Sequence, residues 1–147
     1  MAATFTAFAG VLLRDHHDAS DQRGQDAAIL SAANSGVTAM ISVRDSSAAD
    51  DVNKVLDLST GTFKKDFEAR SRSFIGIVQQ AKVVTQGQVV AEGIESRDGD
   101  SATVLVSATS SVSNAAGANN ESRSWRLRVT MTDDGGQYKM SKVDFVA

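Results

Sequence analysis

The two histidines of the chain, His16 and His17, lie in a charged run with Asp15, Asp18 and Asp21. Such groups could hold a metal ion or transfer protons. Adjacent histidines, however, project about 100° apart on a helix and to opposite faces of a strand, so they do not chelate one ion as a pair. The run also precedes the main apolar stripe of the chain. We therefore predict a solvated joint, and the alternative is a pH-sensitive contact with lipid headgroups or a partner.

The rest of the sequence offers little catalytic chemistry. No nucleophile elbow, phosphate-binding loop or paired-carboxylate spacing occurs, and the chain has no cysteine. Asp57, Asp66 and Glu92 are the carboxylates that could point into an interior, but the expected faces place all three in solvent. We therefore predict a protein that is not an enzyme and that carries no cofactor and no metal ion.

Basic side chains near the C-terminus could form a docking surface for an acidic partner. They are Arg123, Arg126, Arg128, Lys139 and Lys142. We expect them to form a stripe on the outer side of a sheet, where charges act mainly on orientation and association rate. The alternative is an ordinary solvated face.

Apolar side chains in the same region could line a cavity. In SRSWRLRVTMT, apolar and polar residues alternate, which is typical of a strand with one buried face. The expected lining consists of Trp125, Leu127, Val129, Met131 and Tyr138. This part of the chain has no histidine, so the predicted cavity is apolar and lacks a general base of that kind.

Three helices are expected before these strands. Residues 20–43 carry apolar side chains at spacings of three and four. Ser46 or Ser47 can cap a short second helix, and Thr60 or Thr62 can cap a long third helix. The third helix is expected to pack through one apolar stripe, formed by Phe63, Phe67, Phe74, Ile77, Val78 and Ala81.

After Ala81 the apolar period changes to two, which predicts strands. Tight turns at Asp98-Gly99 and at residues 133–136 separate neighbouring strands, and Gly87 and Gly93 are expected to mark bulges or bends in the first one. The predicted fold class is α+β, with three N-terminal helices packed on a curved, four-stranded antiparallel sheet.

The bulk composition suits one folded domain of 147 residues, and a net charge of −3 with a pI of about 5.3 gives no reason to expect nucleic acid. The apolar opening, residues 2–13, is shorter than the roughly 20 residues of a membrane-spanning helix. It is either an amphipathic helix packing on the domain or the tail of a transmembrane helix. We favour the second, with residues 1–17 as anchor remnant and juxtamembrane joint and residues 18–147 as a single domain.

Several stretches carry a family resemblance: TGTFKKDF, GQVVAEGI, SWRLRVTM and YKMSKVDFV. From about Arg14 to Ala147 the chain resembles the soluble domain of the Mce-associated membrane proteins. The resemblance implies a nuclear transport factor 2-like cone fold and a single N-terminal anchor in the cytoplasmic membrane, with the domain outside it. It also implies a role beside the Mce lipid-import systems of actinobacterial envelopes.

The expected function is therefore that of a non-enzymatic, membrane-anchored accessory protein that stabilises an Mce-type lipid-import complex. Its expected partners are Mce transporter subunits or other envelope proteins, and further copies of itself. Two alternatives stay open. One is a periplasmic scaffold component of a type IV secretion-like system, and the other is a cone-fold domain that binds a small molecule or lipid.

Overall fold

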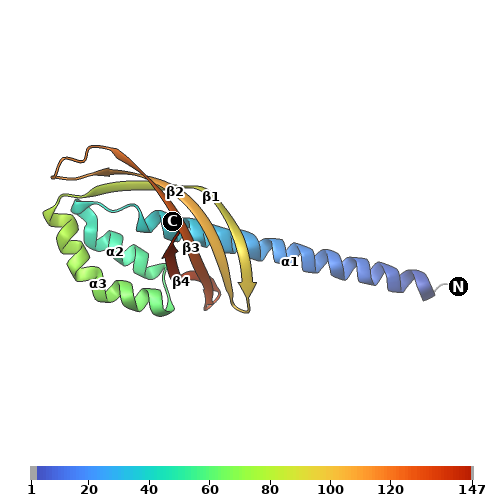
Figure 1. Ribbon diagram of the computed structural model, residues 1–147. Coiled ribbons are helices and arrows are strands. Elements are labelled where there is room, and N and C mark those ends of the chain that lie inside the picture. Colours follow the sequence, from blue (N-terminus) through green and yellow to red (C-terminus); the bar gives the residue numbers. More distant parts are fainter. Residues whose placement is uncertain (1–2, 147) are drawn as a thin grey trace.

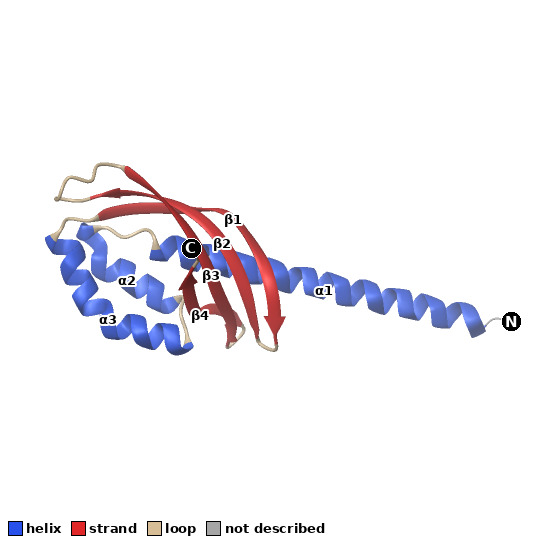
Figure 2. Cartoon of the chain, viewed as in Figure 1, coloured by secondary structure: helices blue, strands red, loops and turns tan. Residues whose placement is uncertain are grey.

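The structure, a computed structural model, describes the backbone of residues 3–146 and the side chains of residues 18–146. Helices precede strands along the chain (Figure 1). The elements are α1 (Ala3–Met40), the 3-10 turn η1 (Asp45–Ser47), α2 (Ala48–Asp57), α3 (Gly61–Gln80), β1 (Val84–Asp98), β2 (Ser101–Ser113), β3 (Glu121–Asp134) and β4 (Gln137–Phe145). The strands form one antiparallel sheet in the order β1-β2-β3-β4 (Figure 2). The predicted α+β class and the strand meander are confirmed.

The helix α1 is longer than predicted. Its backbone is helical from Ala3 rather than from about Ser20, and it ends at Met40 rather than Val43. Its C-terminal half packs on the sheet through the predicted stripe, in which Ile29, Ala33 and Val37 are buried. The N-terminal half extends beyond the sheet and away from α2 and α3 (Figure 1).

The predicted N-terminal features coincide with this extended part of α1. His16 and His17 lie within the helix, but their side chains, like that of Asp15, are outside the described residues. The predicted division at residue 17 falls inside the same helix, and the membrane anchor stays a prediction. Within the described part of the chain, no helix contains a stretch that is long and apolar enough to cross a membrane.

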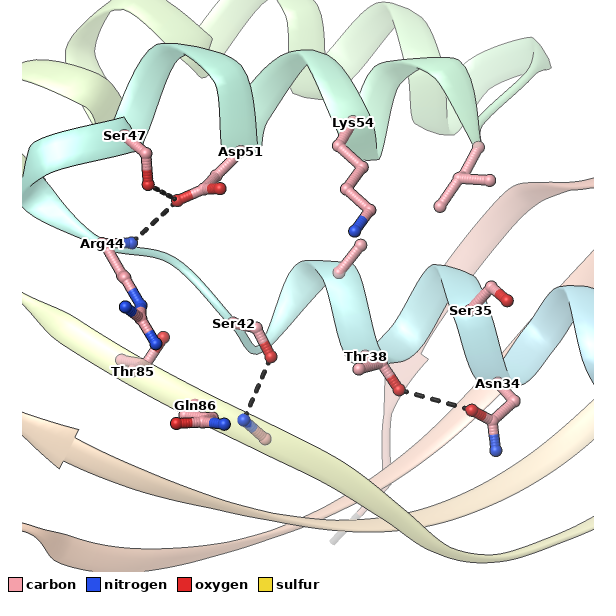
Figure 3. Close-up of a pocket in the computed structure, with 13 residues that line it drawn as sticks. Asn34, Ser35, Thr38, Ser42, Arg44, Ser47, Asp51, Lys54, Thr85 and Gln86 are labelled. Atoms are coloured by element: carbon pink, nitrogen blue, oxygen red, sulfur yellow. Dashed lines mark hydrogen bonds between the residues drawn. The ribbon is translucent and has the colours of Figure 1, made fainter.

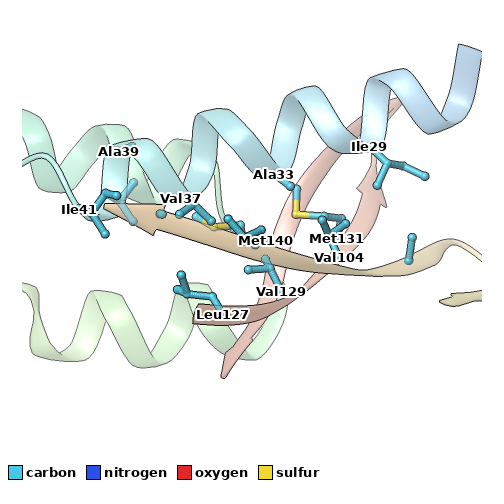
Figure 4. Packing of buried hydrophobic residues seen from close by; sticks show 14 residues of the cluster. Ile29, Ala33, Val37, Ala39, Ile41, Val104, Leu127, Val129, Met131 and Met140 are labelled. Atoms are coloured by element: carbon cyan, nitrogen blue, oxygen red, sulfur yellow. The ribbon is translucent and has the colours of Figure 1, made fainter. Parts of the chain in front are cut away.

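The core lies between α1 and the inner face of the sheet (Figure 4). Val104, Val129, Met131 and Met140 are completely buried there. A smaller cluster of Val43, Ala48 and Val78 joins α3 to the start of α2. The predicted stripe of α3 is wrong at Ile77, which is 62% exposed, because Ile75 packs against the smaller cluster instead.

The glycines of β1 do not mark its bulges. The pairing with β2 skips Val90 and Glu95, whereas Gly87 pairs regularly with Ser110. A β-carbon at Gly87 would collide with the side chain of Ile41. Gly87 is therefore required by the close approach of α1, and the predicted role in a bulge is wrong.

The bulge at Val90 reverses which residues of β1 face the helices, because a bulge shifts the alternation of side chains by one residue. Glu92 pairs with Val106 and Ile94 pairs with Val104, so both side chains of β1 lie on the inner face. The bulge thus allows Ile94 to pack against the core.

Backbone contacts from the helical part protect both edges of the sheet in part. On β4, the Met140 N–H donates to the Leu58 carbonyl and the Met140 carbonyl accepts from the Thr60 N–H, at 2.9 and 2.8 Å. On β1, the Thr85 N–H donates to the Val43 carbonyl at 2.8 Å. These contacts fix the α1–α2 connection and the α2–α3 connection against opposite edges.

Candidate functional site

A polar cleft opens where the end of α1, the helix α2 and the start of β1 meet (Figure 3). Its volume is about 780 Å³. Most lining residues carry a hydroxyl, an amide or a charge: Asn34, Ser35, Thr38, Ser42, Arg44, Ser47, Asp51, Lys54, Thr85 and Gln86; the others are Ala39, Leu58 and Gly87. We call this site the polar cleft.

Backbone and side-chain hydrogen bonds hold the walls of the polar cleft. The Ser42 hydroxyl accepts a bond of 3.0 Å from the Gly87 N–H, which joins the end of α1 to β1. The Thr85 hydroxyl accepts a bond of 2.9 Å from the Val43 N–H. The cleft is therefore built by contacts between three elements rather than by one flexible loop.

Asp51 ties α2 to the segment that precedes it. Its Oδ2 atom accepts from the Arg44 N–H and from the Ser47 hydroxyl, both at 2.9 Å. Ser47 occupies the predicted N-cap position of α2, but its hydroxyl makes no capping bond to the helix backbone. Thr60 likewise occupies the cap position of α3 without a side-chain cap bond. The cap positions were predictable, while the bonds were not.

Two cations line the polar cleft. Figure 3 shows Lys54 extending from α2 toward α1 and Arg44 lying beside Thr85. Both side chains are exposed, and neither makes an ion pair within 4.0 Å among the residues whose side chains are described. The polar cleft is thus rich in donors, and its one carboxylate, that of Asp51, already accepts two hydrogen bonds.

The residues predicted to line an apolar cavity form part of the packed core. Leu127, Val129 and Met131 are at most 1% exposed and lie in the cluster that also contains α1 (Figure 4). Because α1 covers this face, their side chains fill the space between helix and sheet. The prediction that they line an open cavity together with Trp125 and Tyr138 is therefore wrong.

Trp125 and Tyr138 lie at the margins of the core, and both are half-buried. The indole Nε1–H of Trp125 donates to the Ser110 hydroxyl at 2.8 Å, which satisfies the polar atoms of both residues. The Trp125 ring also lies 5.8 Å from the Phe145 ring, measured between centroids. The contacts of Trp125 are thus structural.

The predicted basic stripe is wrong in one member. The register of β3 with β2 is unbroken from Glu121 to Thr132, so Arg123 lies on the same face as Trp125. Arg126 and Arg128 lie on the opposite, outer face. Lys139 and Lys142 pair with Thr132 and Thr130 and share that outer face. Four of the five predicted residues are thus together, and their docking role stays a prediction.

Acidic neighbours offset most of these basic side chains. The closest pair joins Arg128 Nε to Glu95 Oε2 at 2.9 Å, and a second bond of 3.2 Å makes it bidentate. The hydrogen bond to Glu95, together with its charge, raises the pKa of Arg128 above the ordinary value. Looser contacts of 3.6 to 3.9 Å join three further pairs: Lys142 with Asp144, Lys139 with Asp134 and Arg123 with Glu121.

Arg126 differs from its neighbours, since it has no ion-pair partner among the described side chains. It borders a groove of about 360 Å³ on the outer face of the sheet. The groove is lined by Ala91, Glu92, Gly93, Leu105, Val106, Ser107, Arg126, Leu127 and Val146. Two of its apolar residues, Leu105 and Val146, are 40% and 38% exposed. We call this site the outer groove.

Of the three carboxylates weighed from the sequence, Asp57 and Asp66 are exposed as predicted. The prediction for Glu92 is wrong, because the bulge at Val90 turns it to the inner face. Its Oε2 atom is buried and makes no hydrogen bond with the described residues. Among the described side chains, no group of three or more histidine, cysteine, aspartate or glutamate residues is arranged to hold a metal ion.

The polar cleft was not predicted from the sequence. Its residues come from α1, α2 and β1, which are separated along the chain and carry no motif. The one local signal was Ser47 as a candidate N-cap of α2.

The family comparison covers the whole chain. A family model described as "Uncharacterized protein Rv1363c/MT1408-like" matches residues 1–147. A relative described as "Uncharacterized protein Rv1363c", from Mycobacterium tuberculosis, is 49% identical over 142 residues. The match spans 97% of this chain and 54% of the relative, so the chain spans about half the length of that relative.

Solved structures share the fold at low sequence identity. The periplasmic domain of DotI superposes with a TM-score of 0.67 at 15% identity, over 82% of this chain and 94% of that one. CagV, described as a VirB8 homolog of a type IV secretion system from Helicobacter pylori, superposes with a TM-score of 0.58 at 13% identity, over 82% and 97%. The helices and the antiparallel sheet thus match the VirB8-type, nuclear transport factor 2-like domains.

Proposed function

Because the chain belongs to the Rv1363c/MT1408-like family and has a VirB8-type fold, we propose that it is a scaffold domain of the cell envelope that binds other envelope proteins. The domain lies outside the cytoplasmic membrane, and α1 leads toward an N-terminal anchor. The observation that carries the proposal lies on the outer face of the sheet, which the described residues leave uncovered. There an apolar groove lies beside Arg126, which has no ion-pair partner among the described side chains.

The structural likenesses favour a secretion-type scaffold over the Mce-associated role. The similar structures are described as a periplasmic domain of DotI and as a VirB8 homolog of a type IV secretion system. Neither the family match nor these likenesses connects the chain to Mce transporters. A partner from a secretion-like assembly is therefore our first candidate, and Mce subunits are the second.

The proposal that the domain is not an enzyme is supported by its polar cleft. A general base must be free to accept a proton from a bound substrate. Both hydrogen bonds to the Asp51 carboxylate, from the Arg44 N–H and the Ser47 hydroxyl, reach its Oδ2 atom and give this residue a structural task. The lining of the polar cleft contains serine and threonine hydroxyls but no histidine that would activate one of them as a nucleophile.

The outer groove has the features of a small protein-docking site. The helices that pack on the sheet do so from its inner side, so the outer face is uncovered by the described residues (Figure 2). Small residues on β1 and β2, namely Ala91, Gly93 and Ser107, form a depression beside Leu105. A partner segment with an apolar side chain and a neighbouring carboxylate would fill the depression and pair with Arg126.

Affinity purification of the full-length, membrane-anchored protein from its own envelope tests this function. We expect envelope proteins to be recovered at constant ratio to the protein, without stoichiometric lipid. Gly93→Val should reduce that recovery at least tenfold, because its side chain occupies the groove. A β-carbon at Gly93 meets no other atom within 4 Å, so the variant should fold.

Arg123→Glu is the matched charge control for Arg126→Glu. Both residues are exposed arginines of β3, but Arg123 lies on the opposite face. We expect Arg126→Glu to lower recovery and Arg123→Glu to leave it unchanged. Recovery of a bound lipid without protein partners would contradict the scaffold function, and equal effects of both substitutions would contradict the assignment of the surface.

A further inference from the structure

The polar cleft has a different chemistry from the outer groove and lies elsewhere in the fold. Its charged residues are Arg44, Lys54 and Asp51, which give it a formal charge of +1, whereas the whole chain carries −3. Two cations that make no ion pair with any described side chain create a local positive potential in this acidic protein, and such a potential favours the binding of anions. Binding at the polar cleft is independent of the scaffold function.

The polar cleft is preformed. The hydrogen bonds from Gly87 N–H to Ser42 and from Arg44 N–H to Asp51 join its three walls. The backbone of Asp45 also donates to the Val83 carbonyl at 2.9 Å, which fixes the strand side of the opening. Ligand sites are commonly clefts of this kind, with polar groups held in place before the ligand arrives.

The charged lining of the polar cleft consists of two cations and one carboxylate. Arg44 and Lys54 have no ion-pair partner among the described side chains, and both hydrogen bonds of Asp51 are made by its Oδ2 atom. The Oδ1 atom of Asn34 accepts from the Thr38 hydroxyl at 3.5 Å, which leaves the Asn34 amide N–H groups for a ligand. The two cations and the Asn34 amide favour a ligand that supplies acceptor oxygens, as a phosphate does.

The neutral part of the lining indicates what the anion is attached to. Hydroxyl and amide side chains such as Ser35, Thr38 and Gln86 surround the cations, and none of the lining residues is aromatic. A nucleobase would find no ring to stack on. A volume of about 780 Å³ leaves room for a polyhydroxylated group beside the phosphate.

From these features we infer that the polar cleft binds a phosphate ester of a polyol. The phosphate pairs with Lys54 and Arg44, and the hydroxyl groups of the polyol exchange hydrogen bonds with the side chains of α1 and β1. This chemistry occurs both in soluble sugar phosphates and in lipid headgroups. The experiment separates these two sources.

The test is a titration of the purified full chain followed by amide chemical shifts in NMR spectra. The soluble probes are myo-inositol 1-phosphate, inorganic phosphate and myo-inositol. We expect saturable shifts of the cleft residues with inositol phosphate, at least tenfold weaker binding of inorganic phosphate, and no saturation with inositol. Added salt should weaken the binding, because the cations are exposed.

Variants connect the binding to the proposed residues. Lys54→Gln and Arg44→Gln should each weaken inositol phosphate binding at least fivefold. Lys65→Gln and Arg70→Gln are matched controls, because both residues are exposed cations on α3 and outside the lining. Absence of saturable shifts in the cleft, or an equal loss with the control variants, would overturn the inference.

Vesicles distinguish the source of the ligand. In a flotation assay, a headgroup ligand predicts that the chain binds vesicles containing phosphatidylinositol and that Lys54→Gln removes this binding. A soluble ligand predicts saturable binding of inositol phosphate without flotation. Binding to any negatively charged vesicle, unaffected by Lys54→Gln, would contradict a cleft site and indicate a nonspecific surface contact.

Discussion

At the scale of single residues, Asp51 is the charged side chain with the clearest structural task. It accepts hydrogen bonds from the Arg44 N–H and the Ser47 hydroxyl and so ties the α1–α2 connection to α2. The contact is partly exposed, which limits its contribution to about 1–2 kcal/mol. It also shapes one wall of the polar cleft.

We expect Asp51→Ala to lower the free energy of unfolding by about 1–2 kcal/mol, because it leaves both donors without their partner. Asp50→Ala is the control, since both acids lie in the first turn of α2 and interact with the helix dipole. Urea unfolding of the two variants measures the difference. Equal midpoints would show that the hydrogen bonds of Asp51 contribute nothing.

At Gly87, the strand β1 lies directly against the side chain of Ile41, the residue that follows α1. Gly87→Ala would force its new methyl group against Ile41, and overpacking of this kind costs about 1–3 kcal/mol. Gly93→Ala is the matched control on the same strand, because its new methyl group meets open space. Thermal unfolding should show a lower midpoint for Gly87→Ala alone, and a lower midpoint for both variants would contradict this packing argument.

Individual residues were less predictable from the sequence than the elements that carry them. Glu92 was placed in solvent because simple alternation along β1 puts it there, and the bulge at Val90 reverses that alternation. The valine itself carries no sequence signal for a bulge. Arg123 illustrates the opposite case, since the alternation with Trp125 that excludes it from the outer face is already present in the sequence.

At the scale of elements, two parts of α1 differ in how far they pack against the sheet. Residues 29–40 pack on the sheet, whereas residues 18–25 are exposed on all sides. Their nearest link to the sheet is Arg97, which forms an ion pair with Asp26 and a hydrogen bond of 3.4 Å with Gln25. Such partly exposed contacts stabilise a structure by at most about 1 kcal/mol.

Hydrogen exchange should resolve these two parts. We expect amides of residues 18–25 to open with free energies near zero and amides of residues 33–39 to open only near the global unfolding free energy. Gly24→Ala should slow exchange in the first group, because alanine favours a helix by about 1 kcal/mol over glycine. Uniform protection along α1 in the isolated chain would contradict this division.

The elements themselves were largely predictable, because their apolar periods are clear. The change of period after Ala81 separates helices from strands, and the turns at Gly99 and at Gly135-Gly136 have the positive φ angles that such turns require. A helix was expected in the apolar opening, but its continuity with the helix that packs on the sheet was not predictable in this way. Residues 18–25 lack the apolar stripe that distinguishes a packed helix from a loop.

At the scale of the whole molecule, the α+β architecture followed from element order, but the open surfaces did not. The polar cleft depends on how α1, α2 and β1 meet, and the outer groove depends on small residues brought together from β1 and β2. Such sites arise from tertiary contacts between distant segments. The sequence pattern correctly predicted that Arg126 lies on the outer face of the sheet. It did not predict that the neighbouring basic residues, Arg128 and Lys142, form ion pairs with acidic residues.

The most direct test of the scaffold function is site-specific photo-crosslinking of the full-length protein in its own cells. A photo-reactive side chain would replace Leu105 in the outer groove, with Ile77 as the control position because it is an exposed apolar residue on α3. We predict a crosslink from position 105 to another envelope protein, lost when Arg126→Glu is added and absent from position 77. Equal crosslinking from both positions, or crosslinks only to lipid, would contradict the account.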